Sequence, residues 1–179
     1  MAEAGVDGAV IHPSVSWDPD ANALAEAAAA RYPDRFAVLG QVPLETPQTS
    51  SALLKGWRKR PGQCGLRYPL IRADQKDWPF DGTLDWLWPV AEAEGLPVAT
   101  MAWRFLPEFA RIAERHPGLR LIIDHCGLIR HEKGAAAFSN IDAVTDLARL
   151  PNVALKATGA PGYSQQGYPF RDIHDGLHR

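Results

Sequence analysis

The amino-acid sequence predicts an α/β protein built on a parallel sheet. Short apolar runs rich in β-branched residues alternate with longer segments rich in alanine and leucine, which is the rhythm of repeated strand–helix units. The strand candidates are almost continuously apolar, a pattern typical of strands that are covered on both faces. The 15 prolines and 15 glycines fall between these segments and mark the turns.

The first half of the chain contains three strand candidates separated by helical segments. Residues 8–13 (GAVIHP) and 36–43 (FAVLGQVP) form the first two apolar runs, and residues 64–71 (CGLRYPLI) form the third. Residues 19–31 begin with a proline in the first turn and are rich in alanine, which favours a helix. We expect a second helix over 50–59.

The alternation continues through the middle of the chain. Residues 83–94 predict a helix, and the short apolar run over 96–101 (LPVATM) predicts a buried strand. The next helix is expected over 107–116, because Pro117 and Gly118 directly follow it and close it.

Two further strands complete the pattern. Residues 119–126 (LRLIIDHC) contain the clearest strand of the sequence, and residues 152–159 (NVALKATG) contain the last. A helix is expected between them over 140–150, and a final structured stretch over 170–179. The chain therefore contains six strand–helix units.

Length and charge limit the classes of protein to which the chain can belong. The 179 residues suit one domain, expected over 1–179, and the 19 Lys and Arg against 21 Asp and Glu argue against a nucleic-acid partner. No apolar run approaches 18 residues, so we expect no membrane partner. The first ten residues lack a basic signal-peptide region, and Cys64 and Cys126 form no Cys-x-x-Cys motif. We therefore expect a cytoplasmic protein without structural zinc.

Two architectures fit this alternation: an open doubly wound sheet and part of a (β/α)8 barrel. The dinucleotide-binding Gly-x-Gly-x-x-Gly motif is absent from the sequence. Polar residues gather instead at the carboxyl ends of several strands, the face where barrels place their chemistry. These residues are His12, Gln41, Arg67, Tyr68, Thr100, Asp124, His125, Lys156 and Thr158.

His125 is the leading catalytic candidate, because it ends a strand and is followed by a turn at Cys126 and Gly127. The alternative is a core histidine that bonds only the backbone. Asp124 precedes it, and strand alternation predicts that its side chain points to the opposite side, toward a helix or neighbouring backbone. Cys126 is expected to be a small buried residue rather than a nucleophile.

Four further residues are candidates for binding the substrate. Arg67 could hold a carboxylate through a two-pronged hydrogen bond, or it could be a surface ion-pair partner. His12, Lys156 and Thr158 would shape the pocket, although Lys156 could equally extend to water.

Five segments in order resemble the amidohydrolase-related (amidohydrolase 2) family of metal-dependent hydrolases. They read GVDGAVIHPS, DRFAVLGQVPL, GLRYPL, LIIDHCG and LPNVALKATG, and the resemblance extends from about Gly5 to Phe170. It is nearest to the lactonase-like branch, which hydrolyses cyclic esters such as sugar lactones and pyrone dicarboxylates. The resemblance implies a partial TIM (β/α)8 barrel, in which the six units match strands two to seven of an apparently truncated domain.

The resemblance also implies which site residues are present. His125 matches the histidine that ends strand six, and Arg67 matches the strand-four position that contacts acidic substrates. The His-x-His pair of strand one and the Asp of strand eight have no counterpart, and the end of strand five reads Ala99-Thr100-Met101. We expect no metal in this chain, although complete members can hold zinc or manganese.

The predicted function is hydrolysis of a lactone, or of a similar ester bond, in a small acidic substrate. His125 would polarise the carbonyl or orient water, and Arg67 would anchor a carboxylate. Without strands one and eight the activity is expected to be impaired. The alternatives are an aromatic-acid decarboxylase of the same superfamily, a non-catalytic fragment or interaction module, and an open flavodoxin-like binding domain.

An incomplete barrel has two unpaired strands. Two missing strands leave a gap of three strand spacings, roughly 14 Å. The flanking strands around Val10 and Val153 would be bare edges with apolar faces, which invite pairing. We therefore expect low stability of the isolated chain, or a homo-oligomer that closes the open barrel.

Overall fold

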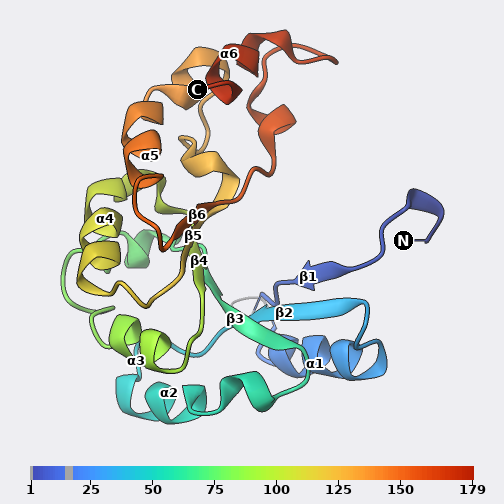
Figure 1. The fold of residues 1–179 in the computed structure, drawn as a ribbon, viewed down its shortest axis with the longest axis vertical. Helices are drawn as coiled ribbons and strands as arrows, with labels where there is room; N and C mark the ends of the chain where they lie inside the picture. Colours follow the sequence, from blue (N-terminus) through green and yellow to red (C-terminus); the bar gives the residue numbers. More distant parts are fainter. Residues whose placement is uncertain (1, 15–17) are drawn as a thin grey trace.

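The computed structural model describes residues 2–14 and 18–179, and its centre is a curved sheet of six parallel strands (Figure 1). The strands lie side by side in chain order, as in a barrel, whereas a doubly wound sheet reverses its order at a switch point. The alternative of a flavodoxin-like sheet is therefore wrong, and the expected barrel-like order is found. The strands are β1 (Ala9–Ile11), β2 (Phe36–Gly40), β3 (Gln63–Tyr68), β4 (Val98–Thr100), β5 (Leu121–Ile123) and β6 (Val153–Leu155).

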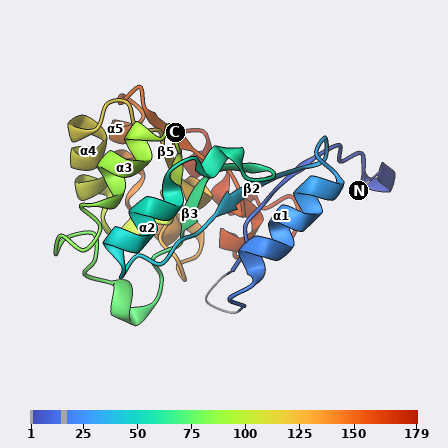
Figure 2. The ribbon, with the colours of Figure 1, turned by 90° about the horizontal axis from the view of Figure 1, so that it is seen from below.

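Helices follow the strands and cover the convex side of the sheet (Figures 1 and 2). The second helix begins at Pro47 rather than at residue 50, and it ends at Leu54. The expected continuation is broken because Gly56 adopts a left-handed conformation, so Trp57–Lys59 form a separate turn. The helices are α1 (Ala21–Arg31), α2 (Pro47–Leu54), α3 (Leu87–Ala93), α4 (Leu106–Arg115), α5 (Ile141–Leu147) and α6 (His174–Leu177).

The main hydrophobic core lies between the sheet and the helices. Leu66, Val98 and Leu121 contribute to it from neighbouring strands, and each is at most 1 % exposed. Tyr68 and Thr100 lie at matching positions one layer further along the strands. Both side chains are buried in this layer, so the expectation that they join the polar group at the strand ends is wrong.

The tyrosine in this layer keeps its hydroxyl paired. Its hydroxyl donates to the backbone oxygen of Val42 and accepts from the backbone nitrogen of the same residue, at 3.2 and 3.0 Å. Burial raises the pKa of Tyr68 well above its usual value. The side chain is therefore a fixed, neutral part of the core.

A second, smaller core lies between α1 and β2. It consists of Ala25, Ala29 and Val38, with Phe36 packed against it. Because the buried side of α1 presents mainly alanine methyl groups, this part of the molecule buries little apolar surface.

The two outer strands form open edges of the sheet. Among the described residues, β1 pairs only with β2 and β6 pairs only with β5. Val10 is 61 % exposed and Leu155 is 47 % exposed, whereas Val153 is half-buried. The expectation of bare apolar edges is confirmed, with Leu155 rather than Val153 as the exposed residue of β6. No helix among the described residues is long and apolar enough to cross a membrane.

We propose that the chain self-associates through these edges, so that charging them weakens the association. Val10→Lys and Leu155→Lys are each expected to raise the dissociation constant of a homo-oligomer about tenfold or more, since losing one buried Val or Leu forfeits roughly 1.5–3 kcal/mol. Leu24→Lys is the matched control, because Leu24 is also 61 % exposed but lies on α1. Sedimentation velocity over a concentration series measures the effect. A wild-type chain that stays monomeric throughout would contradict the expectation.

Candidate active site

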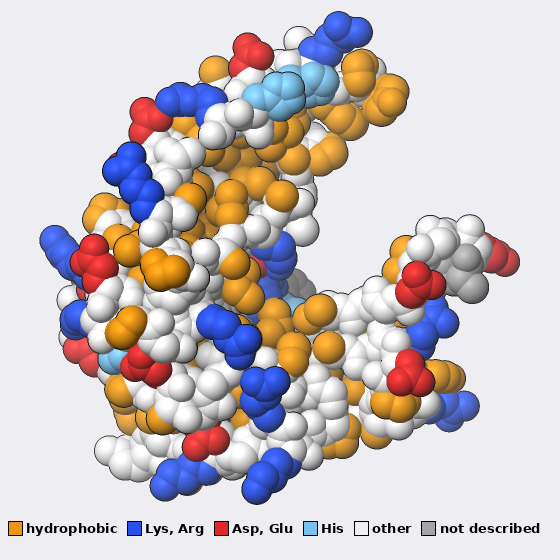
Figure 3. All heavy atoms as spheres, viewed as in Figure 1, with side chains coloured by type: hydrophobic (Ala, Val, Ile, Leu, Met, Phe, Trp, Pro, Cys, Tyr) orange, Lys and Arg blue, Asp and Glu red, His pale blue; other side chains and the backbone are white. Residues whose placement is uncertain are grey.

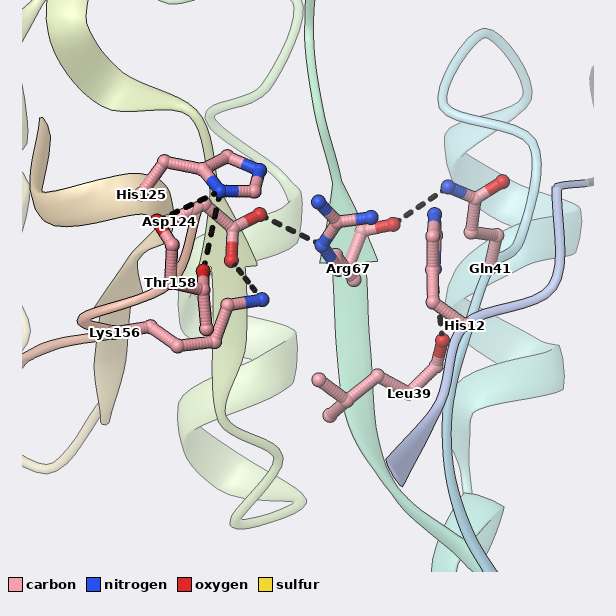
Figure 4. Close-up of polar contacts among 8 residues, drawn as sticks. All are labelled: His12, Leu39, Gln41, Arg67, Asp124, His125, Lys156 and Thr158. Atoms are coloured by element: carbon pink, nitrogen blue, oxygen red, sulfur yellow. Dashed lines mark hydrogen bonds and ion pairs between the residues drawn. The ribbon is translucent and has the colours of Figure 1, made fainter. Parts of the chain in front are cut away.

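The candidate site lies in the hollow on the concave side of the sheet. Figure 3 shows basic and histidine side chains gathered at the floor of this hollow. Figure 4 shows the contributing residues at the carboxyl ends of the strands, with the β1 and β2 side chains facing those that follow β5 and β6. All five predicted site residues belong to this group: His12, Arg67, His125, Lys156 and Thr158.

A buried carboxylate, Asp124, lies at the centre of the group. Its side chain is 0 % exposed, and its two oxygens contact different cations. Arg67 Nε, on β3, donates to Oδ2 at 2.7 Å, and Lys156 Nζ, just after β6, lies 2.5 Å from Oδ1. The expectation that Asp124 points toward a helix or backbone is wrong, because it joins two of the predicted binding residues.

The backbone after β5 explains the error. The strand ends at Ile123, and His125 and Cys126 both adopt left-handed conformations with φ of 54°. Gly127 follows with φ of 63°. Strict alternation of side chains holds only along an extended strand, so it does not apply across this turn. The turn brings His125 to the same site as Asp124.

His125 is held through one ring nitrogen. Its Nδ1 lies 3.3 Å from the backbone oxygen of Thr158 and 3.1 Å from the Thr158 hydroxyl (Figure 4). Because a carbonyl oxygen can only accept, the first contact requires Nδ1 to carry the proton. In the neutral ring, Nε2 then carries the lone pair and can accept a proton from water.

His12 lies on the opposite side of the hollow in a similar arrangement. Its Nδ1 donates to the backbone oxygen of Leu39 at 3.3 Å. Burial lowers the pKa of His12 below its usual 6.5, and the positive charges of Arg67 and Lys156 lower it further. The bond to Leu39 and the charge of Asp124 oppose these effects without reversing them. His12 is therefore neutral at pH 7.

This lowered pKa makes stability depend on pH. The folded protein binds the His12 proton less readily than the unfolded chain, so the free energy of unfolding should decrease as the pH falls below about 6.5. His12→Gln should reduce the loss of stability between pH 7.5 and pH 5.5, measured by urea unfolding. His178→Gln, at an exposed position, is the control. An equal loss in His12→Gln and wild type would contradict the assignment.

Two neighbours of the predicted residues complete the site. Gln41 Nε2 donates to the backbone oxygen of Arg67 at 2.6 Å, which links β2 to β3 above the hollow. Gln41 also lines a groove of about 920 Å³ that runs beside the site along Leu70, Ile71 and Trp78. Cys126 is buried, and its burial raises the pKa of the thiol, so the side chain is a poor nucleophile.

The donor groups do not fit a catalytic divalent metal. Such a site uses three protein ligands, commonly His or carboxylate, and a water. No group of three His, Cys, Asp or Glu side chains comes together in residues 2–14 and 18–179. The only carboxylate at the centre of the site is Asp124, and both of its oxygens already contact cations, which would repel a metal ion.

Comparisons with known proteins agree with the fold and indicate a family. Residues 1–175 match the family model described as Amidohydrolase. The chain is 28 % identical over 180 residues to 4-sulfomuconolactone hydrolase from Hydrogenophaga intermedia, covering 97 % of the chain and 55 % of that protein. It is 29 % identical over 160 residues to L-fucono-1,5-lactonase from Burkholderia ambifaria, covering 89 % and 54 %. The chain thus spans about half the length of the curated relatives it matches.

A solved structure shares the architecture. An amidohydrolase from Burkholderia multivorans with bound zinc superposes with a TM-score of 0.78 at 21 % identity, over 99 % of this chain and 63 % of that one. This likeness confirms the predicted barrel-like α/β fold.

Proposed function

The chain belongs to the amidohydrolase family, and we propose that its concave site serves the hydrolysis of a lactone, or of a similar ester bond, in a small acidic substrate. Two relatives that hydrolyse lactones support the reaction class. The observation that carries the proposal is the placement of a tethered histidine and two cations in one hollow.

His125 is the proposed general base. Its Nε2 takes a proton from a water molecule, and the water oxygen forms a bond to the carbonyl carbon of the lactone. The ring C–O bond then breaks, and the departing ring oxygen takes that proton back from His125 Nε2 to give a hydroxy acid and the neutral imidazole. A positioned base of this kind typically contributes a factor of about 10²–10⁴ to the rate.

Arg67 and Lys156 are the proposed anchors for the carboxylate of the substrate. With Asp124 between them, the three side chains carry a net charge of +1, which suits one carboxylate. Thr158 contributes by holding His125, and His12 forms the neutral opposite wall.

The anchor is tested by Arg67→Met. We expect the KM for an acidic lactone to rise about 10- to 100-fold, since a hydrogen bond to a charged group contributes roughly 1.5–3 kcal/mol. The matched control is Arg149→Met, because Arg149 pairs with Asp146 on the exposed surface. Steady-state kinetics of lactone opening provide the measurement.

Three results would overturn parts of this proposal. An unchanged KM in Arg67→Met would remove the anchor. Release of carbon dioxide from aromatic acids without any lactone opening would favour a decarboxylase. Binding of acidic lactones without turnover would favour a non-catalytic binding module.

A further inference from the structure

We propose that Asp124 is a positioning residue that holds Arg67 and Lys156 together as one clamp for the substrate carboxylate. This inference rests on the function proposed above and names the group that orients the acidic substrate.

The first argument is the location of the charge. Asp124 is fully buried, yet its partners come from β3 and from the segment after β6, on either side of the strand that precedes it. A buried ion pair often stabilises a protein no more than apolar residues of the same size would. Stability alone therefore does not account for a charge at this position.

The second argument is the geometry of the contacts. Each oxygen of Asp124 contacts one cation. Arg67 Nε donates a hydrogen bond to Oδ2 at 2.7 Å, and Lys156 Nζ forms an ion pair with Oδ1 at 2.5 Å. Arg67 uses Nε for this contact, and Figure 4 shows one of its two terminal nitrogens pointing away from Asp124. The ammonium of Lys156 carries three donors, and its contact with Oδ1 is an ion pair without an aligned hydrogen bond. Both cations therefore keep donors for a ligand while their positions are fixed.

The third argument is what the cations would do without Asp124. Two positive charges brought together in a partly buried hollow repel each other. The side chain of Lys156 is already 37 % exposed, so without Asp124 it would turn toward water. Asp124 thus prevents the loss of one half of the clamp.

The test compares two substrates that differ in one group. One is a five-membered lactone with a carboxymethyl substituent, and the other carries a carboxamide in place of the carboxylate. We expect Asp124→Asn to lower the ratio of their kcat/KM values, acid over carboxamide, about tenfold. Removing the negative charge of Asp124 would by itself favour the acidic lactone electrostatically. A lower kcat/KM ratio therefore indicates that the two cations have lost their positions. An unchanged or higher ratio would overturn the proposal.

Two controls separate positioning from a structural role. Glu26→Gln removes another carboxylate that pairs with an arginine, Arg60, and its side chain is 15 % exposed. It should leave the ratio unchanged. If Asp124 acts through its two partners, Asp124→Asn should not lower the ratio any further in an Arg67→Met/Lys156→Met background. A further drop there would overturn the proposal.

A second variant covers the case in which Asp124→Asn does not fold. Lys156→Met removes the more exposed partner and keeps the Arg67–Asp124 contact, and it should also lower the ratio. An unchanged ratio in Lys156→Met would contradict the clamp.

Direct binding distinguishes failure of the inference from failure of the proposed function. Cyclopentylacetate, which has no ester bond, is titrated calorimetrically against wild type and Asp124→Asn. If wild type opens no lactone but binds this carboxylate about tenfold more tightly than the variant, the function fails and the clamp stands. If wild type binds it no better than cyclopentylacetamide, the clamp fails as well.

Discussion

Replacing His125 by alanine is expected to lower kcat for acidic lactones by about 10²–10⁴, because this removes the proposed general base. The KM should change little, since Arg67 and Lys156 remain. Lactone opening followed in a pH-stat provides the measurement, at equal protein concentration and with folding checked by circular dichroism.

The backbone at this position determines the best control. His125 has φ of 54°, and Asn tolerates this left-handed region better than Ala does. His125→Asn should therefore keep the turn but lack the imidazole, and it should be as inactive as His125→Ala. Wild-type turnover in either variant would refute the role of His125 as the base.

Replacing Phe109 by alanine is expected to cost about 3–5 kcal/mol of stability, the upper range for a single core substitution. Phe109 lies on α4, is 0 % exposed and packs edge-on against Phe105 with ring centroids 6.1 Å apart. Because domains of this kind are stable by only about 5–15 kcal/mol, a large share of the folded population would be lost.

The matched control is Phe80→Ala. Phe80 also packs edge-on against Phe105, at 6.4 Å, but is 60 % exposed. Its replacement should cost less than about 1 kcal/mol. Urea unfolding of both variants measures the difference, and similar midpoints for the two would contradict this account of the core.

The strands and most helices follow from local chemistry. Continuous apolar runs such as residues 119–126 are found at β5, and the alanine-rich segment over 19–31 is found at α1. The helix over 50–59 was predicted too long because Gly56 turns left-handed, which a glycine permits but does not require.

Part of the site also follows from the sequence. In a parallel sheet the carboxyl ends of all strands meet at one face, so His12, Arg67 and Lys156 were expected to lie together. Their place at strand ends also put Tyr68 and Thr100 among the polar residues, but their register with the buried Ile123 directs them into the core.

Asp124 shows why the rest of the site required the structure. The direction of the Asp124 side chain depends on where β5 ends. The backbone is extended at Ile123 and left-handed at His125, and no local sequence pattern predicts this change. Its partner Arg67 is 57 residues away, so the contact depends on the closure of the whole sheet. The one sequence feature that indicates this geometry is the predicted turn at Cys126 and Gly127, directly after His125.

The division of the core into two clusters has a consequence for motion. The cluster of α1 and β2 is held by two alanines and one valine, and β1 beyond it has a partner on one side only. Opening of this segment exposes little apolar surface, so it requires less free energy than unfolding of the main core. We therefore expect the amide hydrogens of α1 and β1 to exchange with solvent before those of β3 to β5.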